Sequence, residues 1–254
     1  MPKLSVVILT KNEEKNIERC LQSVSFADEV IVIDDHSTDK TVEIAKKNKA
    51  TVYEHALDND FAAQRNFGLQ KTEYDWVLFV DADEVVSTDL QKEISQAIVK
   101  SIYEAYKIRR RDFFWGQELK HGETQKVRNN GLIRLMIKGS GEWSGSVHEE
   151  FYTKANVGML KKFLDHYPHQ TIKEFLESVN HYSTLRAREL EKTGKKTNSF
   201  EIVLLPFGKF LLNYFLYLGF LDGPAGFAYS FFMSFHSFLV RAKLFQYTEY
   251  EENG

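Results

Sequence analysis

The sequence predicts an α/β protein with a mainly parallel, doubly wound sheet, followed by a C-terminal helical region rich in aromatic residues. Three observations support this prediction. Short apolar runs alternate with helical patterns four times within about the first 80 residues, and parallel strands need crossover helices of this kind. Polar clusters follow several of the apolar runs. Aromatic side chains crowd the segment from Phe200 to Tyr250.

The composition narrows the class of protein. A chain of 254 residues is long enough for one large domain, or for one domain with an appendage. Its 33 basic and 36 acidic residues give a formal charge of −3, so we expect no nucleic-acid partner. Cys20 is the single cysteine, which excludes a disulfide scaffold and a cysteine-ligated zinc site. The apolar run at the N-terminus is too short for the core of a signal peptide, which favours the cytoplasm.

Four apolar runs with β-branched residues predict buried strands, and helical patterns lie between them. The predicted strands are Leu4–Leu9, Glu29–Ile33, Ala50–Glu54 and Trp76–Val80. The predicted helices are one that carries Ile17, Leu21 and Val24, a second at Thr41–Lys47 and a third at Ala62–Leu69. Ser37 or Thr38 is the expected N-cap of the second helix.

Polar side chains follow three of these strands. Thr10 to Glu13 follow the first strand, Asp34 and Asp35 the second, and Asp81 and Asp83 the fourth. The ligand crevice of a doubly wound sheet lies outside the carboxyl ends of its strands. We therefore expect the clusters to meet at one edge and form a site there.

Asp81 and Asp83 are one residue apart, so in an extended segment both carboxylates point to the same side. Two such carboxylates repel unless a cation lies between them. Mg²⁺ or Mn²⁺, completed by phosphate oxygens, fits this pattern, whereas the alternative is a solvated turn in which an aspartate caps the next helix. Arg65 suits a phosphate or carboxylate partner, or else forms an ordinary surface salt bridge.

Four segments, SVVILTKNEE, VIVIDDHSTDKT, AAQRNFGL and DWVLFVDADE, in this order and at this spacing, resemble the family 2 glycosyltransferases of the GT-A fold. The resemblance is close over about the first 90 residues. It implies roles for seven residues in donor binding. By this resemblance Thr10, Asn12 and Glu13 lie against the nucleotide, Asp35 binds a uracil-type base, Arg65 orders the site, Asp81 lies near the ribose and sugar, and Asp83 binds the metal that bridges the diphosphate.

The next part of the chain predicts a second half of the same domain. A helix at Asp89–Lys100 and strands at Ala105–Arg110 and Leu132–Ile137 are expected, and residues 112–131 show no clear period and predict a mobile loop over the acceptor side. We therefore expect a catalytic domain at residues 1–160, with a donor half at about 1–90 and an acceptor half at 91–160. The helical region is then residues 161–254.

The segment from Trp143 to Glu150 is similar to the Trp-x-Gly-x-Val-His-Glu segment of the subgroup that adds sugars to the lipopolysaccharide inner core. That likeness implies Glu149 as the base that deprotonates the acceptor, with Glu150 in reserve. His148 reaches the metal or the diphosphate, or is a structural hydrogen-bonding residue. The more widespread Glu-Asp pair with Gln-x-x-Arg-Trp is absent.

The resemblance implies an inverting, metal-dependent enzyme that moves a sugar from a UDP-sugar, UDP-glucose or a relative, to a lipid-linked or lipopolysaccharide-core glycan. Two rivals stay open. A nucleotidyltransferase would want a Gly-rich, basic loop after the first strand, where this chain has Thr10 to Glu13. A non-catalytic, membrane-associated protein that binds a nucleotide sugar or a glycan would lack the base.

The apolar C-terminal region is expected to bind a partner, and the sequence leaves open which one. A charged helix is expected at Thr171–Glu191, and the spacing of His166, His169 and His181 fits no compact zinc motif. Ile202–Phe220 is nearly all apolar and almost long enough to cross a bilayer. A Gly-Pro turn and a second aromatic helix follow. We expect an interfacial hairpin at the inner face of the cytoplasmic membrane, or helices that pack on the core or form a homo-oligomer.

Overall fold

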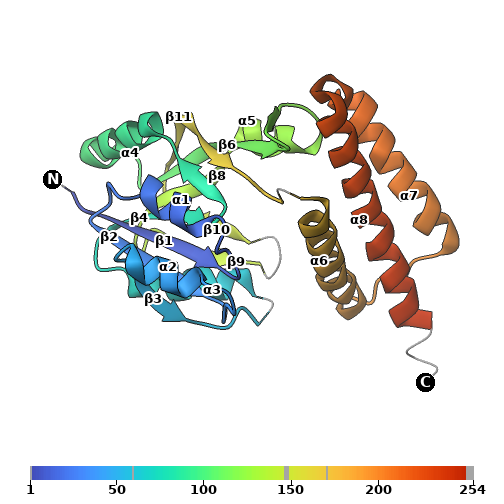
Figure 1. Ribbon diagram of the computed structural model, residues 1–254, viewed down its shortest axis with the longest axis horizontal. Helices are drawn as coiled ribbons and strands as arrows, with labels where there is room; N and C mark the ends of the chain where they lie inside the picture. Colours follow the sequence, from blue (N-terminus) through green and yellow to red (C-terminus); the bar gives the residue numbers. More distant parts are fainter. Residues whose placement is uncertain (1, 59, 146–148, 170, 250–254) are drawn as a thin grey trace. The chain divides into compact units, whose positions relative to one another are not determined.

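The structure is a computed structural model that describes residues 2–58, 60–145, 149–169 and 171–249 (Figure 1). The chain forms two compact units. The first contains residues 1–111 and 127–166, and the second contains residues 112–126 and 167–254. The expected boundary was residue 160, whereas the first unit ends at residue 166. In addition, residues 112–126, which were expected in the first domain, belong to the second unit.

The first unit is built on a mixed sheet in the order β3-β2-β1-β4-β8-β6-β11-β5. The strands are β1 Leu4–Thr10, β2 Glu29–Asp34, β3 Thr51–Glu54, β4 Trp76–Asp81, β5 Glu84–Val86, β6 Ala105–Phe114, β8 Leu132–Ile137 and β11 Val157–His166. Strands β3, β2, β1 and β4 are parallel, and the pairs β4–β8, β8–β6 and β11–β5 are antiparallel. The predicted α/β fold is confirmed.

Both faces of this sheet are covered, which explains why its central strands are apolar throughout. One face packs against α1 (Ile17–Ser23), α2 (Thr41–Lys47) and α4 (Thr88–Lys100). The other packs against α3 (Phe61–Lys71) and the hairpin of β9 (Gly141–Ser144) and β10 (Glu150–Thr153). Gly68 lets α3 approach closely, because a Cβ atom there would lie 2.6 Å from Val7 Cγ1.

Two local predictions were wrong. The N-cap of α2 is Lys40, because the Ser37 hydroxyl and the Thr38 N–H bind the backbone and side chain of Asn12 instead. The expected loop at 112–131 has regular structure: β7 (Gln117–Leu119), a 3₁₀ turn (Gly122–Thr124) and α5 (Gln125–Asn130).

The first unit extends beyond residue 160 because β11 continues to His166. Lys161 and Lys162 are two successive polar residues with exposed side chains, and they interrupt the alternation of apolar and polar residues that would have indicated this strand. Their backbone N–H groups both donate to the Glu93 carboxylate at 2.8 Å. A polar pair in mid-strand is thus held by a neighbouring helix.

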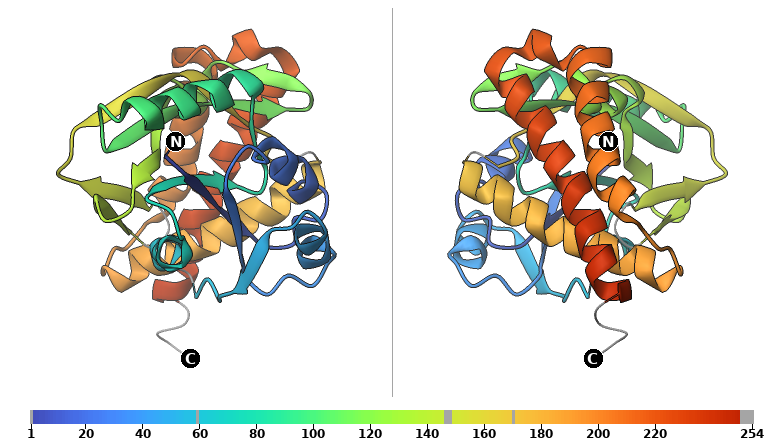
Figure 2. Two further views of the ribbon diagram at one scale, coloured as in Figure 1. Left: turned by 90° about the vertical axis from the view of Figure 1, so that its left-hand side faces the viewer. Right: turned by 90° about the vertical axis from the view of Figure 1, so that its right-hand side faces the viewer.

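The second unit is a helical layer with a small hairpin. Residues 112–114 of β6 pair with β7, and the helices are α6 (Ile172–Lys192), α7 (Ser199–Leu211) and α8 (Gly223–Glu249). A π-helical turn (Leu212–Leu216) and a 3₁₀ turn (Gly219–Asp222) join α7 to α8. Figure 2 shows α7 and α8 side by side. The predicted aromatic-rich helical region is confirmed.

An aromatic cluster forms the core of the second unit. Phe175 on α6 lies against the rings of Phe114, Tyr229 and Phe232, with ring centroids 4.7–5.9 Å apart. The helix that carries Phe175 begins with a capping box, in which Thr171 and Glu174 bind each other's backbone N–H groups. The core of this unit is therefore formed by aromatic residues of β6 and α8 that pack against Phe175 of α6.

Candidate functional site

The polar clusters predicted to meet do end at one edge of the sheet. Thr10 at the end of β1 lies opposite Asp34 on β2, and Leu9 lies opposite Asp81 on β4. Parallel strands place their carboxyl ends at the same edge. The register thus brings Thr10, Asp34 and Asp81 to neighbouring positions.

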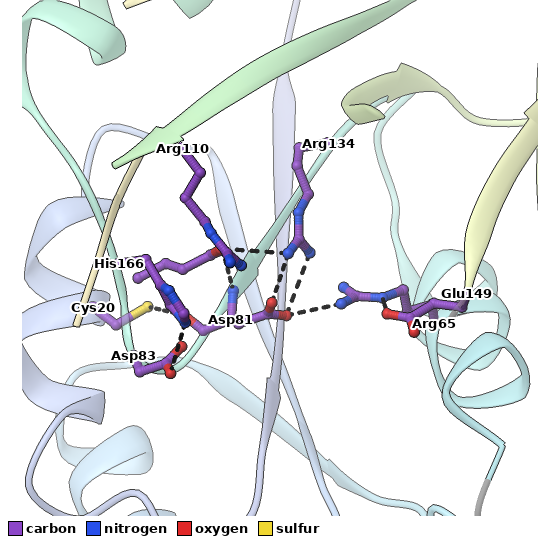
Figure 3. Close-up of polar contacts among 9 residues, drawn as sticks. Cys20, Arg65, Asp81, Asp83, Arg110, Arg134, Glu149 and His166 are labelled. Carbon is purple, nitrogen blue, oxygen red and sulfur yellow. Dashed lines mark hydrogen bonds and ion pairs between the residues drawn. The ribbon is translucent and has the colours of Figure 1, made fainter. Parts of the chain in front are cut away.

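Two arginines hold Asp81 (Figure 3). Arg134 Nη2 donates to Asp81 Oδ2 at 2.6 Å, and Arg65 Nη2 donates to Asp81 Oδ1 at 2.9 Å. Burial of the Asp81 carboxyl opposes its ionisation, but Arg134 and Arg65 outweigh burial and hold its pKa well below the ordinary value. Asp81 is therefore a fixed anion whose two oxygens are already engaged.

Arg65 joins Asp81 to the predicted base. Its Nε donates to Glu149 Oε1 at 2.8 Å, and its guanidinium carbon lies 4.8 Å from the centroid of the Trp143 ring. The Arg65 side chain is only 4% exposed. Nη1 of Arg65 has no hydrogen-bond partner among the described residues, which leaves one donor of a buried cation available to a ligand.

A second carboxylate, that of Glu84, supports the backbone of Asp81. Glu84 is fully buried, and its Oε2 accepts the backbone N–H of Asp81 at 2.9 Å. Arg134 lies 3.4 Å and Arg110 lies 3.8 Å from Glu84 Oε1. Burial raises the pKa of Glu84, although Arg134 acts in the opposite direction. Glu84 thus fixes the backbone of the turn that carries the two aspartates.

Asp83 points to a different partner. Its Oδ2 lies 3.2 Å from Nε2 of His166, at the end of β11 (Figure 3). Burial opposes ionisation of Asp83, but the interaction with the His166 ring outweighs it and lowers the pKa of Asp83. In the part of the chain that the structure describes, no group of three or more His, Cys, Asp or Glu side chains is placed to hold a metal ion.

The carboxyl ends of β1 and β2 carry unpaired polar atoms. Thr10 Oγ1 and Asp34 Oδ1 are buried, and neither has a hydrogen-bond partner among the described residues. Asp35 is held by Lys11 Nζ at 2.7 Å and by the Leu57 N–H at 3.0 Å. Burial opposes ionisation of Asp35, but these two donors outweigh it and lower its pKa. Buried polar atoms without a partner are rare, so this end of the sheet is suited to a polar ligand.

Asn12 and Glu13 make contacts between loops. The Asn12 backbone has a positive φ of 54°, and its side-chain oxygen accepts the Thr38 N–H at 2.8 Å. The Glu13 N–H donates to Thr41 Oγ1 at 2.7 Å, and its carboxylate accepts from Asn16 Nδ2. These two residues therefore join the loops after β1 and β2 to each other.

The three candidates around residue 149 differ in their placement. Glu149 belongs to the Arg65 network. Glu150 is an exposed residue that begins β10, opposite Ser144. His148 lies outside the described residues. Of the two glutamates, the geometry therefore connects only Glu149 to Arg65 among the described contacts.

Sequence reasoning gave no role in the site to three residues that the structure places in or beside it: Glu84, Arg134 and His166. Asp34 was expected at this edge, but without a role of its own. Arg134 carried a signal, because it is the single charge in the apolar run LIRLMI. His166 was considered only with His169 and His181 for a zinc motif, and nothing in the pattern indicated the strand that brings it to Asp83.

The N-terminal part of the chain, residues 5–164, matches a known family. The profile of glycosyl transferase family 2 matches residues 5–164. An uncharacterized glycosyltransferase of Rickettsia typhi is 33% identical over 262 residues, which cover 96% of this chain and 87% of that protein. The lipopolysaccharide core biosynthesis glycosyltransferase LpsC of Rhizobium meliloti is 27% identical over 252 residues, 96% of this chain and 92% of that protein.

A solved structure with partial similarity is that of glucosyl-3-phosphoglycerate synthase from Mycobacterium tuberculosis, in complex with Mn²⁺, uridine diphosphate and glucosyl-3-phosphoglycerate. It is 25% identical, covers 44% of each chain and has a TM-score of 0.38.

Proposed function

The chain belongs to glycosyl transferase family 2, and from that premise we propose that it moves a sugar from a UDP-sugar, glucose being the first candidate, to a glycan acceptor with inversion at the sugar carbon. The chain has the GT-A fold, and as a member of this family it is a glycosyltransferase that uses a nucleotide-sugar donor. The donor sugar, the acceptor, the metal and the role of each residue are parts of the proposal. The observation that carries it is the chain of contacts Asp81–Arg65–Glu149.

The nucleotide is proposed to bind at the ends of β1 and β2. Thr10 Oγ1 and Asp34 Oδ1, which are buried and have no partner among the residues that the structure describes, support this placement, since a ligand would satisfy them. Asp35 presents a carboxylate that is already ionised and oriented by Lys11. A carboxylate accepts the N–H of a uracil-type base. Asn12 and Glu13 support this pocket by joining its two loops.

Mg²⁺ or Mn²⁺ is proposed to bind at Asp83. The donor set fits this ion, because Mg²⁺ often takes one or two protein carboxylates and completes its shell with substrate phosphates and water. Asp83 is the better ligand of the two aspartates, since the oxygens of Asp81 are engaged by two arginines. His166, whose Nε2 lies 3.2 Å from Asp83 Oδ2, would orient that carboxylate. The bound ion would neutralise charge on the departing diphosphate.

Glu149 is proposed to act as the base. In the reaction the acceptor oxygen forms a bond to the anomeric carbon while the bond from that carbon to the diphosphate breaks. The acceptor proton passes to Glu149, and the electron pair leaves with UDP. Arg65 holds the Glu149 carboxylate in place. Its Nη1, which has no partner in the part of the chain that the structure describes, is suited to a phosphate or sugar oxygen.

The acceptor is proposed to be a glycan on a lipid, at the inner face of the cytoplasmic membrane. The similarity to LpsC, whose name places it in lipopolysaccharide core biosynthesis, supports a glycolipid of that kind. The exposed apolar residues of the second unit support a membrane location. A non-catalytic binding protein would not need Glu149 joined to Asp81 through a buried arginine.

The test is release of UDP from UDP-sugars by the full-length protein, with Mg²⁺ or Mn²⁺ and with chelator. UDP-glucose with metal should give turnover, and the chelator should abolish it. Asp83→Asn should lower kcat by about 10³-fold or more, because the ion and the charge that it neutralises are lost. His181→Ala, an exposed histidine of the second unit, is the matched control and should keep full activity. Full turnover by Asp83→Asn would remove Asp83 from the reaction.

A further inference from the structure

The helical unit presents a large apolar surface that its own core does not use. On α7, Phe200, Val203 and Phe207 are 77%, 65% and 60% exposed. Leu216 in the π-helical turn and Phe231 on α8 are 73% and 52% exposed. Positions 200, 203 and 207 lie on one face of a helix, so Phe200, Val203 and Phe207 form one apolar stripe along α7. We call α7, the two turns and the first half of α8, residues 199–238, the apolar hairpin.

The apolar hairpin carries almost no charge. Between Ser199 and Phe238 the charged residues are Glu201, Lys209 and Asp222. Each has a partner inside the unit: Glu201 accepts from Thr197 Oγ1 at 3.0 Å, Lys209 Nζ lies 3.2 Å from Glu123, and Asp222 Oδ1 lies 2.8 Å from Nδ1 of His121. The outer surface of the hairpin is therefore left to apolar and aromatic side chains. A protein–protein interface normally has a polar rim, whereas a lipid-facing surface excludes charged side chains.

Basic residues flank both ends of this surface. Lys195 and Lys196 are exposed just before the N-cap of α7, Asn198. Lys120 is exposed at the other end, where its backbone N–H donates to Asp222 at 2.9 Å. Lysines at the edges of an apolar face suit the anionic headgroups of a bilayer. The charge pattern therefore favours a membrane over a second copy of the chain.

The hairpin is suited to lie in the membrane plane. Ser199–Leu216 is long and apolar enough to cross a membrane by length and composition, and 11% of it is buried. Its chain reverses directly afterwards, at Leu218 with φ 59° and Gly223 with φ 59°. Asp222 at this turn binds the backbone of Lys120 and His121. If residues 199–216 crossed the membrane, the β6–β7 hairpin next to Lys120 would be carried into the bilayer. The unpaired backbone groups at the edge of that hairpin would then lose their contact with water.

We propose that the apolar hairpin binds an anionic phospholipid bilayer in the plane of the interface, with Phe200, Val203, Phe207, Leu216 and Phe231 in the acyl boundary and the flanking lysines at the headgroups. This inference deepens the proposed membrane location. It rests on the geometry of the second unit, so it stands or falls independently of sugar transfer.

The test is sedimentation of the purified full-length protein with phosphatidylglycerol-containing vesicles, without any nucleotide sugar. The wild-type protein should bind, and the double variant Val203→Glu, Phe207→Glu should bind at least tenfold more weakly, because two carboxylates would enter the acyl boundary. Met159→Glu, an exposed apolar position of β11 in the first unit, is the matched control and should bind like wild type. Circular dichroism should be unchanged in both variants.

Three further results decide the mode of binding. Lys195→Glu with Lys196→Glu should weaken binding several-fold at low salt and little in pure phosphatidylcholine. In intact cells that express Lys120→Cys or Lys196→Cys, neither thiol should react with an impermeant maleimide before permeabilisation. Reaction of one of the two would show a membrane crossing and overturn the in-plane arrangement. No vesicle binding, together with a dimer that Phe207→Glu makes monomeric, would assign the surface to a second copy instead.

Discussion

The two units treat charge in opposite ways. In the first, the acidic side chains of Asp81 and Glu84 pair with Arg65 and Arg134 inside the unit. In the second, large apolar side chains such as Phe207 stay in solvent. Each departs from the usual distribution in globular proteins. The difference is consistent with the two proposals, a small polar ligand for the first unit and a broad apolar partner for the second.

The sharpest test of this contrast is to remove one charge from each unit. Arg134→Met leaves Asp81 and the fully buried Glu84 without their main counter-charge, and the free energy of unfolding should fall by about 3–5 kcal/mol. Arg186→Met removes a half-exposed arginine that pairs with Glu189 on α6, and the change should stay below about 1 kcal/mol. Urea unfolding measures both. Equal losses would mean that the buried network has no special place in the stability of the first unit.

The pair Glu149 and Glu150 sharpens the comparison within the site. Glu149→Gln should lower kcat by about 10²- to 10⁴-fold, because the amide cannot accept the acceptor proton. Glu150→Gln should stay within about twofold of wild type, because Glu150 is exposed and outside the Arg65 network. Initial rates at saturating donor and acceptor measure the effect. A larger loss in Glu150→Gln would exchange the roles of the two residues.

The sequence was sufficient for what local pattern determines. The four parallel strands and the helices between them follow from apolar periodicity, and the register of those strands then brings Thr10 and Asp81 to one edge. Contacts across the chain were out of reach. Arg134 and Asp81 are 53 residues apart in the chain. His166 contacts Asp83 from β11, a strand that the sequence pattern did not indicate. No local pattern records which distant strand supplies the counter-charge.

The same limit applied to residues 112–131. Trp115 and Gly116 both adopt positive φ at the tip of the β6–β7 hairpin, a turn that suits glycine and is unusual for tryptophan. The segment therefore showed no strand period and was expected to be a loop. Its structure depends on Asp222, more than 100 residues away, which binds the backbone of Lys120 and His121.

The smallest expected effect concerns the edge of the site, where a charge pair is partly in solvent. In the folded protein the pKa of Asp35 lies below its ordinary value, about 3.9, with burial opposed by Lys11 and the Leu57 N–H. A depressed pKa stabilises the fold above the unfolded pKa, and this contribution is lost as the pH falls through the folded pKa. Lys11→Met should therefore cost stability near pH 7 and progressively less towards pH 3.

The size of that cost is limited by solvent. The Lys11 side chain is 60% exposed, so the loss near pH 7 should be about 0.5–1 kcal/mol, well below the loss expected for Arg134→Met. Urea unfolding of both proteins at several pH values between 3 and 7 gives the difference curve. A difference that stays constant over this range would show that Lys11 supports the loop by packing, because only an interaction with the ionised Asp35 carboxylate disappears when that group takes up a proton.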